Sequence, residues 1–459
     1  MKGQTRTSGQ LINGHWQSMK IKTKNVGIFS IILASLASIS MAFAQDDSEM
    51  AATEHQAGQT AQLTLDDLRT FTDVFNQARR NYVEEVDDKT LLDAAIRGML
   101  QELDPHSNYL PAKEYEELND VARGRYSGIG IEVRARDGKI VVNAIINDSP
   151  ADQAGMNPGD VITSIDGKSI KGRPLPEAMD ELLGQPDTGV VLTVMPPDGE
   201  ERELTIIREY IKVPTLSFRL LDDSFGYFKM TQFHRESALD LEQSLDSIKS
   251  DGIELRALII DLRNNPGGVL KQAVAMADGF LDEGVIVSTR GRNSTMQMEF
   301  TAHPGQWLPK TPVMLLVDRT TASASEVLAG ALQDHARALI VGERTFGKGS
   351  VQSVLPLRNG AGIKLTTARY YTPSGRSIQA EGIQPDVVVV WEEFADTGDS
   401  RLREADLERH LSKETEPGGD ALAGTQAILE DFPLEEVLGA LREAGIITDE
   451  SDTGESETS

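Results

Sequence analysis

Apolar residues recur at helical spacing in two segments near the start of the chain. From Thr64 onwards apolar side chains fall three or four positions apart, and Asp67 completes a capping signal with Thr64. A second stretch of the same kind begins at Thr90. These patterns predict an N-terminal helical domain over residues 62–120.

The pattern changes near residue 121. Over residues 125–145 short runs of β-forming residues are broken by glycines and an Asp-Gly turn, which is typical of strands joined by tight turns. Beyond them we expect a helix at residues 174–184 and strands at 189–195 and 203–207. Together they predict a compact, β-rich domain with two helices over residues 121–213.

From Pro214 onwards, strand and helix patterns alternate. Four runs are continuously apolar, as strands covered on both faces are: residues 255–262, 284–289, 313–318 and 337–342. Helical patterns lie between them at residues 236–250, 268–282 and 322–335. This alternation predicts an α/β core over residues 214–396. The expected fold class is therefore α/β mixed multidomain: a helical N-terminal region, a β-rich domain, an α/β core and a helical C-terminal segment.

The first residues have the order of a secretory signal. Three lysines between positions 20 and 24 precede an apolar run at residues 26–43, and Ala42-Phe43-Ala44 supplies a cleavage site. We predict a signal peptide over residues 1–44, with Met19 as an alternative start. The expected location is the periplasm. An uncleaved anchor, with the chain attached to the inner membrane and facing the periplasm, is the alternative.

The remaining end segments are polar. Residues 45–61 are expected to form a flexible lead. Residues 397–448 begin as a charged, glycine-rich loop and continue into a helix at about 425–444. The acidic tail at residues 449–459 is expected to be disordered.

Composition excludes several kinds of chemistry. The chain has no cysteine, so it has no disulfides, no thiol nucleophile and no thiolate metal site. Its formal net charge is −27, and it falls to −32 when residues 1–44, with five basic residues and no acid, are removed. Because such a charge repels phosphates, we expect no nucleic-acid partner.

The segment GERTFGKGS at residues 342–350 resembles a nucleotide phosphate loop. It has the pattern G-x-x-x-x-G-K, and the apolar strand ending at Asp261 resembles the acidic strand that helps to hold magnesium. However, Gly349 stands where a Ser or Thr is needed, and the residues after Lys348 have the pattern of a strand. The phosphate loop works by opening a helix, so we expect no bound nucleotide.

The segment TASASEVLAGALQD begins where a buried strand gives way to a helix at Ser323. One account is a capping box, in which Ser323 caps the helix and Glu326 reaches back to it. The other is a nucleophile placed among small residues, with the Ala324 N–H beside it as an oxyanion donor. The local sequence leaves both accounts open.

A serine nucleophile needs a base, and none of the seven histidines lies in a nucleophile motif. A buried lysine serves when desolvation lowers its pKa, and Lys348 lies between two glycines in an apolar neighbourhood. If Lys348 opens a strand, Gln352 points to the same face and could orient the amine. The turn after the strand ending at Asp261 contains Gly267 and Gly268, whose N–H groups are candidates for a second oxyanion donor.

Seven ordered motifs give the chain a clear resemblance. They are LDPHSNYL (103–110), SGIGIEV (127–133), SPADQAGMNPGDVITSIDG (149–167), DLRNNPGG (261–268), TASASEVLAGALQD (321–334), GERTFGKGSVQ (342–352) and YYTPSGRSIQAEGIQPDV (370–387). Over about residues 65–391 the chain resembles the carboxyl-terminal processing peptidases, also called tail-specific proteases. That resemblance implies a Ser–Lys endopeptidase with a PDZ domain, and it implies neither cofactor nor metal. With the signal-like N-terminus, the expected protein is an exported serine endopeptidase.

The resemblance also implies roles for the candidate residues. Ser323 is the expected nucleophile, Lys348 its general base and Gln352 the residue that orients the lysine. The implied oxyanion donors are the Ala324 N–H and the backbone amide of either Gly267 or Gly268. The resemblance does not decide between the two glycines. Thr321 stands where the family often has serine, and Ser325 has the wrong spacing to Lys348.

Residues 121–213 resemble the PDZ domain. In that domain the loop of Ser127, Gly128, Ile129 and Gly130 would bind the terminal carboxylate of a substrate through backbone amides. The implied partners are protein substrates with exposed C-terminal tails. By the same resemblance, the helical regions at 64–120 and 425–444 are expected to contact an adaptor protein or a second copy of the chain. The rival, a PDZ scaffold with a dead peptidase core, predicts a broken Ser–Lys–Gln set.

Overall fold

The computed structural model describes residues 63–136, 138–389, 402–412 and 434–443. The chain divides into two compact units, residues 1–74 and 75–459. The predicted signal peptide, flexible lead and acidic tail lie outside the described residues. Within the described ranges, no helix has both the length and the apolar character that a membrane crossing requires.

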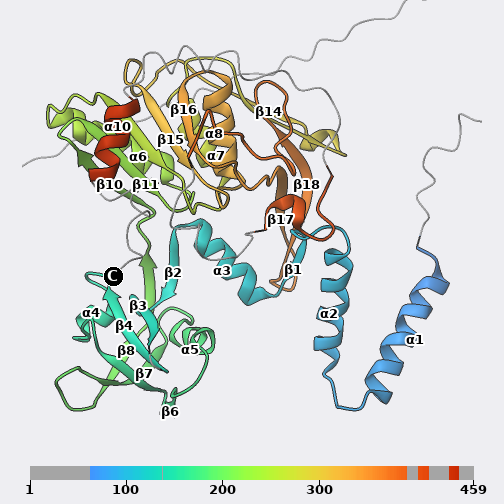
Figure 1. Ribbon diagram of the computed structural model, residues 1–459. Helices are drawn as coiled ribbons and strands as arrows, with labels where there is room; N and C mark the ends of the chain where they lie inside the picture. Colours follow the sequence, from blue (N-terminus) through green and yellow to red (C-terminus); the bar gives the residue numbers. More distant parts are fainter. Residues whose placement is uncertain (1–62, 137, 390–401, 413–433, 444–459) are drawn as a thin grey trace, which may run out of the picture. The chain divides into compact units, whose positions relative to one another are not determined.

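Three helices occupy the predicted N-terminal region (Figure 1): α1 (Leu65–Asn81), α2 (Asp88–Gln101) and α3 (Ala112–Ala122). The capping pair at the start of α1 is present, with the Thr64 N–H donating to Asp67 at 2.8 Å. Helix α2 begins two residues before Thr90, because Asp87 is its N-cap and accepts from the Thr90 N–H at 3.0 Å. The predicted helices exist, and the start of the second was set too late.

The β-rich domain is built on one sheet with the strand order β3-β4-β5-β7-β8, and β6 pairs with β5. Its strands are β3 (Ile131–Arg136), β4 (Lys139–Ile145), β5 (Val161–Ile165), β6 (Lys168–Ser169), β7 (Gly189–Met195) and β8 (Arg202–Ile207). Two helices, α4 (Pro150–Gln153) and α5 (Leu175–Leu182), complete it, and β2 (Arg125–Gly128) pairs with β9 (Glu209–Lys212). Strands β7 and β8 and helix α5 confirm the three elements predicted there.

The α/β core contains a sheet with the order β10-β11-β12-β15-β16-β19. Its strands are β10 (Leu216–Leu221), β11 (Phe225–Met230), β12 (Ala257–Asp261), β15 (Val313–Val317), β16 (Ala338–Gly342) and β19 (Val387–Val388). From β11 to β19 all neighbours are parallel. Every residue of β12, β15 and β16 is buried, as their continuous apolar runs predict.

Helices cover both faces of this sheet (Figure 1). Alternate residues of β12, such as Leu258 and Ile260, pack against α6 (Ser237–Ser250), α7 (Leu270–Asp278) and α8 (Ala324–Asp334). The intervening residues, such as Ile259, pack against α10 (Leu434–Glu443). Because the strands are parallel, their carboxyl ends meet at one edge, and the loops after β12, β15 and β16 lie there together.

A second, antiparallel sheet has the order β1-β18-β13-β14, with β17 paired to β18. Its strands are β1 (Asn108–Leu110), β13 (Val285–Gly291), β14 (Met298–Thr301), β17 (Ser350–Pro356) and β18 (Gly362–Tyr371). The apolar run at 284–289 is therefore a strand, but not of the parallel sheet. Both Ile286 and Val287 are buried in the core, which gives β13 the apolar run of a parallel strand. Strand β1 joins the preceding helical region to this sheet through β18.

Candidate active site

Hydrogen bonds hold the three loops at the carboxyl edge of the parallel sheet together. The Ala322 N–H donates to the Asn265 carbonyl at 3.0 Å, which joins the loop after β12 to the loop after β15. The Phe346 N–H donates to the Thr321 carbonyl at 3.0 Å, which joins the loop after β15 to the loop after β16. These contacts bring together the three loops that carry the candidate residues.

Ser323 occupies a strained turn between β15 and α8. Its backbone φ is +57° and ψ is −115°, a conformation that costs a non-glycine residue on the order of 1–3 kcal/mol. Its neighbours Ala322 and Ala324 are buried, whereas Ser323 is only half-buried. A serine at the mouth of a helix, with small residues on both sides, has the geometry of a nucleophile presented to a substrate.

Glu326 connects the Ser323 turn to the loop that carries Lys348. Its side chain is fully buried, and its Oε2 accepts from the Ser323 N–H at 2.7 Å and from the Lys348 N–H at 2.9 Å. Its Oε1 accepts from the Thr345 hydroxyl at 2.6 Å and from the Gly347 N–H at 2.7 Å. The capping contact predicted for Glu326 is present, and the same carboxylate also fixes the second loop. The sequence contains no local signal for that second contact.

The environment of Glu326 opposes its ionisation. Burial raises the pKa of Glu326 to about 7, although the hydrogen bonds from Thr345, Gly347, Ser323 and Lys348 all act in the other direction. The four donors keep this side chain in place.

Lys348 lies in a turn that precedes β17. Burial lowers the pKa of the Lys348 amine, and the nearby Lys364 lowers it further, against the opposing effect of Glu404, Glu326 and Asp104. The net pKa is below the usual lysine value, as a general base requires. Lys348 is half-buried, and its pKa is shifted in the direction that the sequence predicts.

The glycines beside Lys348 allow the loop to pack closely. A Cβ on Gly349 would lie 2.2 Å from the Gln379 backbone nitrogen. Gly347 has a φ of +98°, which favours glycine. Gly349 stands where a phosphate loop has Ser or Thr, and close packing requires glycine at this position.

The observed geometry of Gln352 differs from the sequence prediction, which places Lys348 and Gln352 on one face of a regular strand. Strand β17 begins at Ser350 rather than at Lys348, and a bulge between Val351 and Gln352 breaks the alternation. Counting four residues along a regular strand therefore does not place Lys348 and Gln352 on one face. The Gln352 amide donates to the Ser350 hydroxyl at 2.9 Å and to the Thr366 hydroxyl at 3.3 Å.

Gly267, the first glycine of the Asn-Pro-Gly-Gly turn, lies directly beside the Ser323 turn. A Cβ on Gly267 would lie 2.8 Å from the Ala324 nitrogen and 2.9 Å from the Ser323 Cβ. The Gly267 N–H already donates to the Asn265 side chain at 2.9 Å. Gly268, with a φ of +137°, is the other candidate for an oxyanion donor beside the Ala324 N–H.

The structure does not fit a nucleotide-binding site, in which Asp261 would help to hold magnesium and the Lys348 loop would bind phosphates. The Asp261 carboxylate is buried and accepts from Tyr227 at 2.7 Å, Lys229 at 3.1 Å and Arg263 at 2.7 Å, so it is already in an ion-pair cluster. Strand β17, not a helix, follows Lys348, which contradicts a nucleotide phosphate loop.

Two other polar residues of helix α8 have structural roles. The Ser325 hydroxyl is buried and donates to the Asn265 carbonyl at 3.2 Å. His335 is the C-cap of α8, with its Nε2 2.7 Å from the Val285 carbonyl oxygen. Neither residue is therefore a candidate for the nucleophile or its base.

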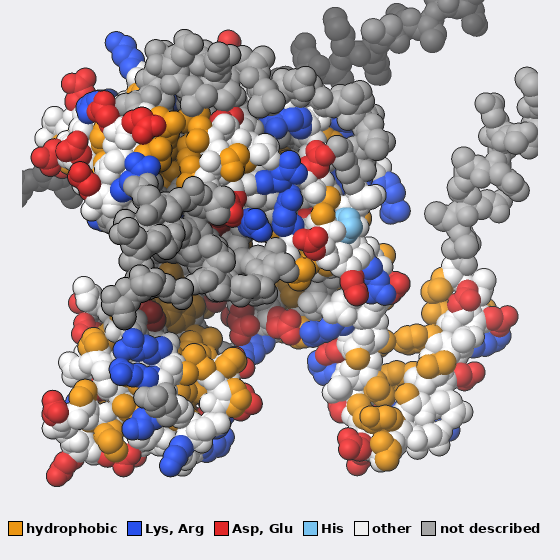
Figure 2. All heavy atoms as spheres, in the orientation of Figure 1, with side chains coloured by type: hydrophobic (Ala, Val, Ile, Leu, Met, Phe, Trp, Pro, Cys, Tyr) orange, Lys and Arg blue, Asp and Glu red, His pale blue; other side chains and the backbone are white. Residues whose placement is uncertain are grey.

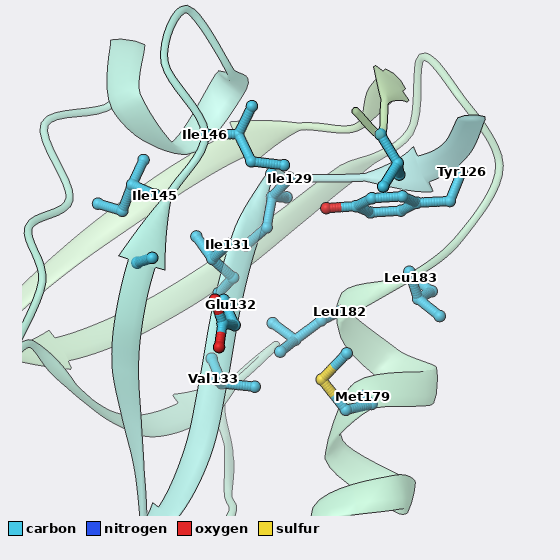
Figure 3. Close-up of a pocket in the computed structure, with 13 residues that line it drawn as sticks. Tyr126, Ile129, Ile131, Glu132, Val133, Ile145, Ile146, Met179, Leu182 and Leu183 are labelled. Carbon is cyan, nitrogen blue, oxygen red and sulfur yellow. The ribbon is translucent and has the colours of Figure 1, made fainter. Parts of the chain in front are cut away.

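The β-rich domain carries an apolar groove between β3 and α5 (Figure 3). The groove has a volume of about 500 Å³, and Ile131 and Val133 on β3 face Met179 and Leu182 on α5. The Tyr126 ring closes one end of it. An extended peptide could pair with β3 and place apolar side chains in this groove.

The four residues predicted to bind a terminal carboxylate divide into two pairs. Ile129 and Gly130 line the groove. Gly130 has a φ of +83°, and a Cβ there would lie 2.3 Å from the Ser149 Cβ, so glycine is required. Ser127 and Gly128 do not line it, and they pair with Tyr210 and Glu209 on β9.

Three parts of the chain match known families. Residues 224–389 match the family described as Peptidase family S41, residues 127–207 match the PDZ domain, and residues 31–114 match the N-terminal domain of activating protease CtpB. The matched ranges contain Ser323 and Lys348 in the first case, and the groove residues on β3 and α5 in the second.

Named relatives match most of the chain. A carboxy-terminal-processing protease of Bartonella bacilliformis is 41% identical over 382 residues, which cover 82% of this chain and 87% of that protein. A probable CtpA-like serine protease of Staphylococcus haemolyticus is 35% identical over 317 residues, covering 69% and 63%. The solved photosystem II D1 C-terminal processing protease is 31% identical, with coverage of 70% and 87% and a TM-score of 0.42. The chain belongs to the carboxy-terminal-processing proteases, serine proteases that combine a PDZ domain with a family S41 peptidase core.

Proposed function

We propose that this protease cleaves peptide bonds by a Ser–Lys mechanism, with Ser323 as nucleophile and Lys348 as general base. The observation that carries the proposal is the Glu326 carboxylate, which binds the backbone N–H groups of both residues. This contact holds the two loops in one arrangement, and the lowered pKa of Lys348 favours the neutral amine that a general base requires.

The reaction follows from these positions. The Ser323 hydroxyl attacks the peptide carbonyl while its proton passes to the Lys348 amine. The C–N bond then breaks, the departing amine takes that proton, and an ester to Ser323 remains. A water that gives its proton to Lys348 hydrolyses the ester and restores the serine. The Ala324 and Gly268 N–H groups stabilise the oxyanion, Gly268 rather than Gly267 because the Gly267 N–H is already bonded to Asn265.

Gln352 is proposed to orient the Lys348 amine. Its amide nitrogen is held by the hydroxyls of Ser350 and Thr366. That leaves its carbonyl oxygen as the group that would accept a hydrogen bond from the lysine. The bulge in β17 is where the strand departs from regular alternation and redirects this side chain.

A serine-directed fluorophosphonate tests the assignment of nucleophile and base. We expect the reagent to modify Ser323, identified by mass mapping, and the reaction to slow by roughly 100-fold or more in Lys348→Met, because the base is lost. Ser325→Ala is the matched control and should still be modified at Ser323. Modification at another residue in the wild type would refute the assignment.

The proposed substrates are proteins with unstructured C-terminal tails that end in apolar residues. The terminal carboxylate would bind the backbone amides of Ile129 and Gly130, the two predicted residues that line the groove, and the tail would add as a strand beside β3. Apolar side chains of the tail would then enter the groove lined by Met179 and Leu182. No cofactor takes part in the proposed reaction.

Met179→Lys tests the groove. The added charge opposes entry of an apolar side chain, so KM for a tailed substrate should rise by roughly tenfold, while kcat on a short peptide without such a tail should change little. Asp180→Asn changes the charge by the same amount on the exposed side of α5 and is the control. An unchanged KM in Met179→Lys would place tail recognition elsewhere.

Export to the periplasm and assembly remain proposals. Export rests on the signal-like order of residues 1–44, and N-terminal sequencing of the mature protein tests it. Assembly, either as a homo-oligomer or with an adaptor, rests on apolar side chains exposed on α1 and α2 (Figure 2), among them Leu65, Phe71 and Met99. The mass of the purified protein in solution tests the homo-oligomer.

A further inference from the structure

Residues 402–412, which none of the seven motifs includes, lie against the loop that carries Lys348. We call this segment the strap. The Glu404 N–H donates to the Phe346 carbonyl at 3.2 Å, and the Arg403 guanidinium donates to the Glu381 carbonyl at 2.9 Å. The strap is therefore attached both to the base loop and to the segment packed against it.

The Glu404 side chain is fully buried within this contact. Its Oε1 accepts from the Gln379 amide at 2.7 Å, and its Oε2 lies 2.7 Å from His106 Nε2. The side-chain oxygen of Gln379, Oε1, accepts in turn from the Gly349 N–H at 3.1 Å. A continuous path of hydrogen bonds thus runs from Glu404 to the peptide unit next to Lys348.

A second path leads from His106 to the other side of the base. The Asp104 carboxylate accepts from the His106 N–H at 2.8 Å and from the Thr366 hydroxyl at 3.1 Å. Thr366 also accepts from Gln352 at 3.3 Å. The motif LDPHSNYL, which the peptidase mechanism does not use, therefore joins the strap to the residue proposed to orient Lys348.

Four charged groups on four separate segments act on the Lys348 amine. They are Lys364 on β18, Glu404 on the strap, Glu326 on α8 and Asp104 in the loop before β1. Burial is the main cause of the lowered pKa of Lys348, and Lys364 adds to it. Glu404 acts in the opposite direction, so the strap limits how far the lysine pKa falls.

We propose that Glu404 is a positioning residue for the general base, which fixes the Gly349 peptide through Gln379 and places a negative charge near the Lys348 amine. The inference rests on the proposed Ser–Lys mechanism. The Glu404 side chain is fully buried, and each of its carboxylate oxygens has one partner. Because an unpaired buried carboxylate is costly, these two contacts hold the side chain in one position, as a positioning role requires.

Glu404→Gln tests the proposal with little change of shape. Glutamine retains both contacts if neutral His106 adopts the tautomer whose Nε2 accepts a hydrogen bond. The measurement is the rate constant for fluorophosphonate modification of Ser323 between pH 5 and 10. Removing the charge lowers the pKa of Lys348, so the acid limb of the profile should move to lower pH by about half a unit or more.

Lys364→Gln is the matched variant of opposite sign. It removes a positive charge, so the pKa of Lys348 rises and the acid limb should move to higher pH. The inference would be overturned if Glu404→Gln lowered the modification rate equally at every pH and left the acid limb in place, while Lys364→Gln moved it. Glu404 would then have only a structural role. If Glu404→Gln does not fold, His106→Gln is the substitute variant. It should slow the modification of Ser323, and an unchanged rate in His106→Gln would overturn the inference.

The same experiment separates this inference from the proposed function. If Ser323→Ala is unmodified and inactive but the Glu404→Gln profile is unshifted, only the role of Glu404 is wrong. If Ser323→Ala still cleaves substrate, the Ser–Lys mechanism itself is wrong, and the role of Glu404 fails with it.

Discussion

Replacing Ser323 with alanine is expected to lower the rate of peptide cleavage by a factor of roughly 10⁴ or more, because no acyl-enzyme can form. Ser323 is the half-buried hydroxyl at the mouth of α8, whereas the neighbouring Ser325 hydroxyl is buried and bonded to the Asn265 carbonyl. No adjacent serine can therefore replace it. The measurement is kcat on an unfolded substrate with a free, apolar C-terminus.

A second variant at the same position separates catalysis from stability. The φ of Ser323 is +57°, which costs alanine about as much as serine but costs glycine little. Ser323→Gly should therefore be as inactive as Ser323→Ala, with a free energy of unfolding higher than that of Ser323→Ala by up to about 1 kcal/mol. Cleavage by either variant at more than a few per cent of the wild-type rate would refute the role of Ser323.

The parts of the fold that the sequence predicts are those with a strong local signal. Strands β12, β15 and β16 are continuous apolar runs, and the rule that parallel strand ends share an edge places Gly268, Ser323 and Lys348 together. Strand β13 shows the limit of that signal. It is apolar because it packs on the core, and nothing in residues 284–289 reveals that its neighbours are antiparallel.

The candidate site was predictable where spacing and residue type carry the chemistry. The direction of the Lys348 pKa shift was predictable, because a lysine between two glycines in an apolar stretch is expected to lose solvent on folding. The expected geometry of Gln352 failed because a bulge breaks the strand alternation, and bulges leave no local pattern here. The contact between His106 and Glu404 joins residues 298 positions apart, so only the folded chain reveals it.

Glu326→Gln is expected to disturb both the stability and the activity of the protein. Each carboxylate oxygen accepts two donors, and at Oε2 both are backbone N–H groups, from Ser323 and Lys348. At Oε1 one of the two donors is the Gly347 N–H. An amide NH₂ group in either place therefore faces at least one backbone N–H that cannot turn away. A buried donor left without a partner costs about 1–3 kcal/mol.

The expected loss of unfolding free energy for Glu326→Gln is therefore about 1–3 kcal/mol at pH 8. Activity should fall by roughly 100-fold or more, because displacement of the turns at Ser323 and Lys348 by even 1 Å separates nucleophile and base. Denaturant unfolding measures the first effect and kcat/KM the second. Glu116→Gln, which removes an exposed carboxylate on α3, is the matched control and should change neither quantity.

The pH dependence gives the role of Glu326 an independent test. Burial raises its pKa to about 7 in the folded chain, above the ordinary carboxyl value of about 4.3 in the unfolded chain. The folded state therefore binds more protons than the unfolded state between about pH 4.5 and 7, and this group's contribution to stability is lost as the pH rises through that window. Wild type should lose more stability between pH 5 and 8 than Glu326→Gln does. Equal losses in the two proteins would mean that Glu326 is already ionised at pH 5, held by its four donors despite burial.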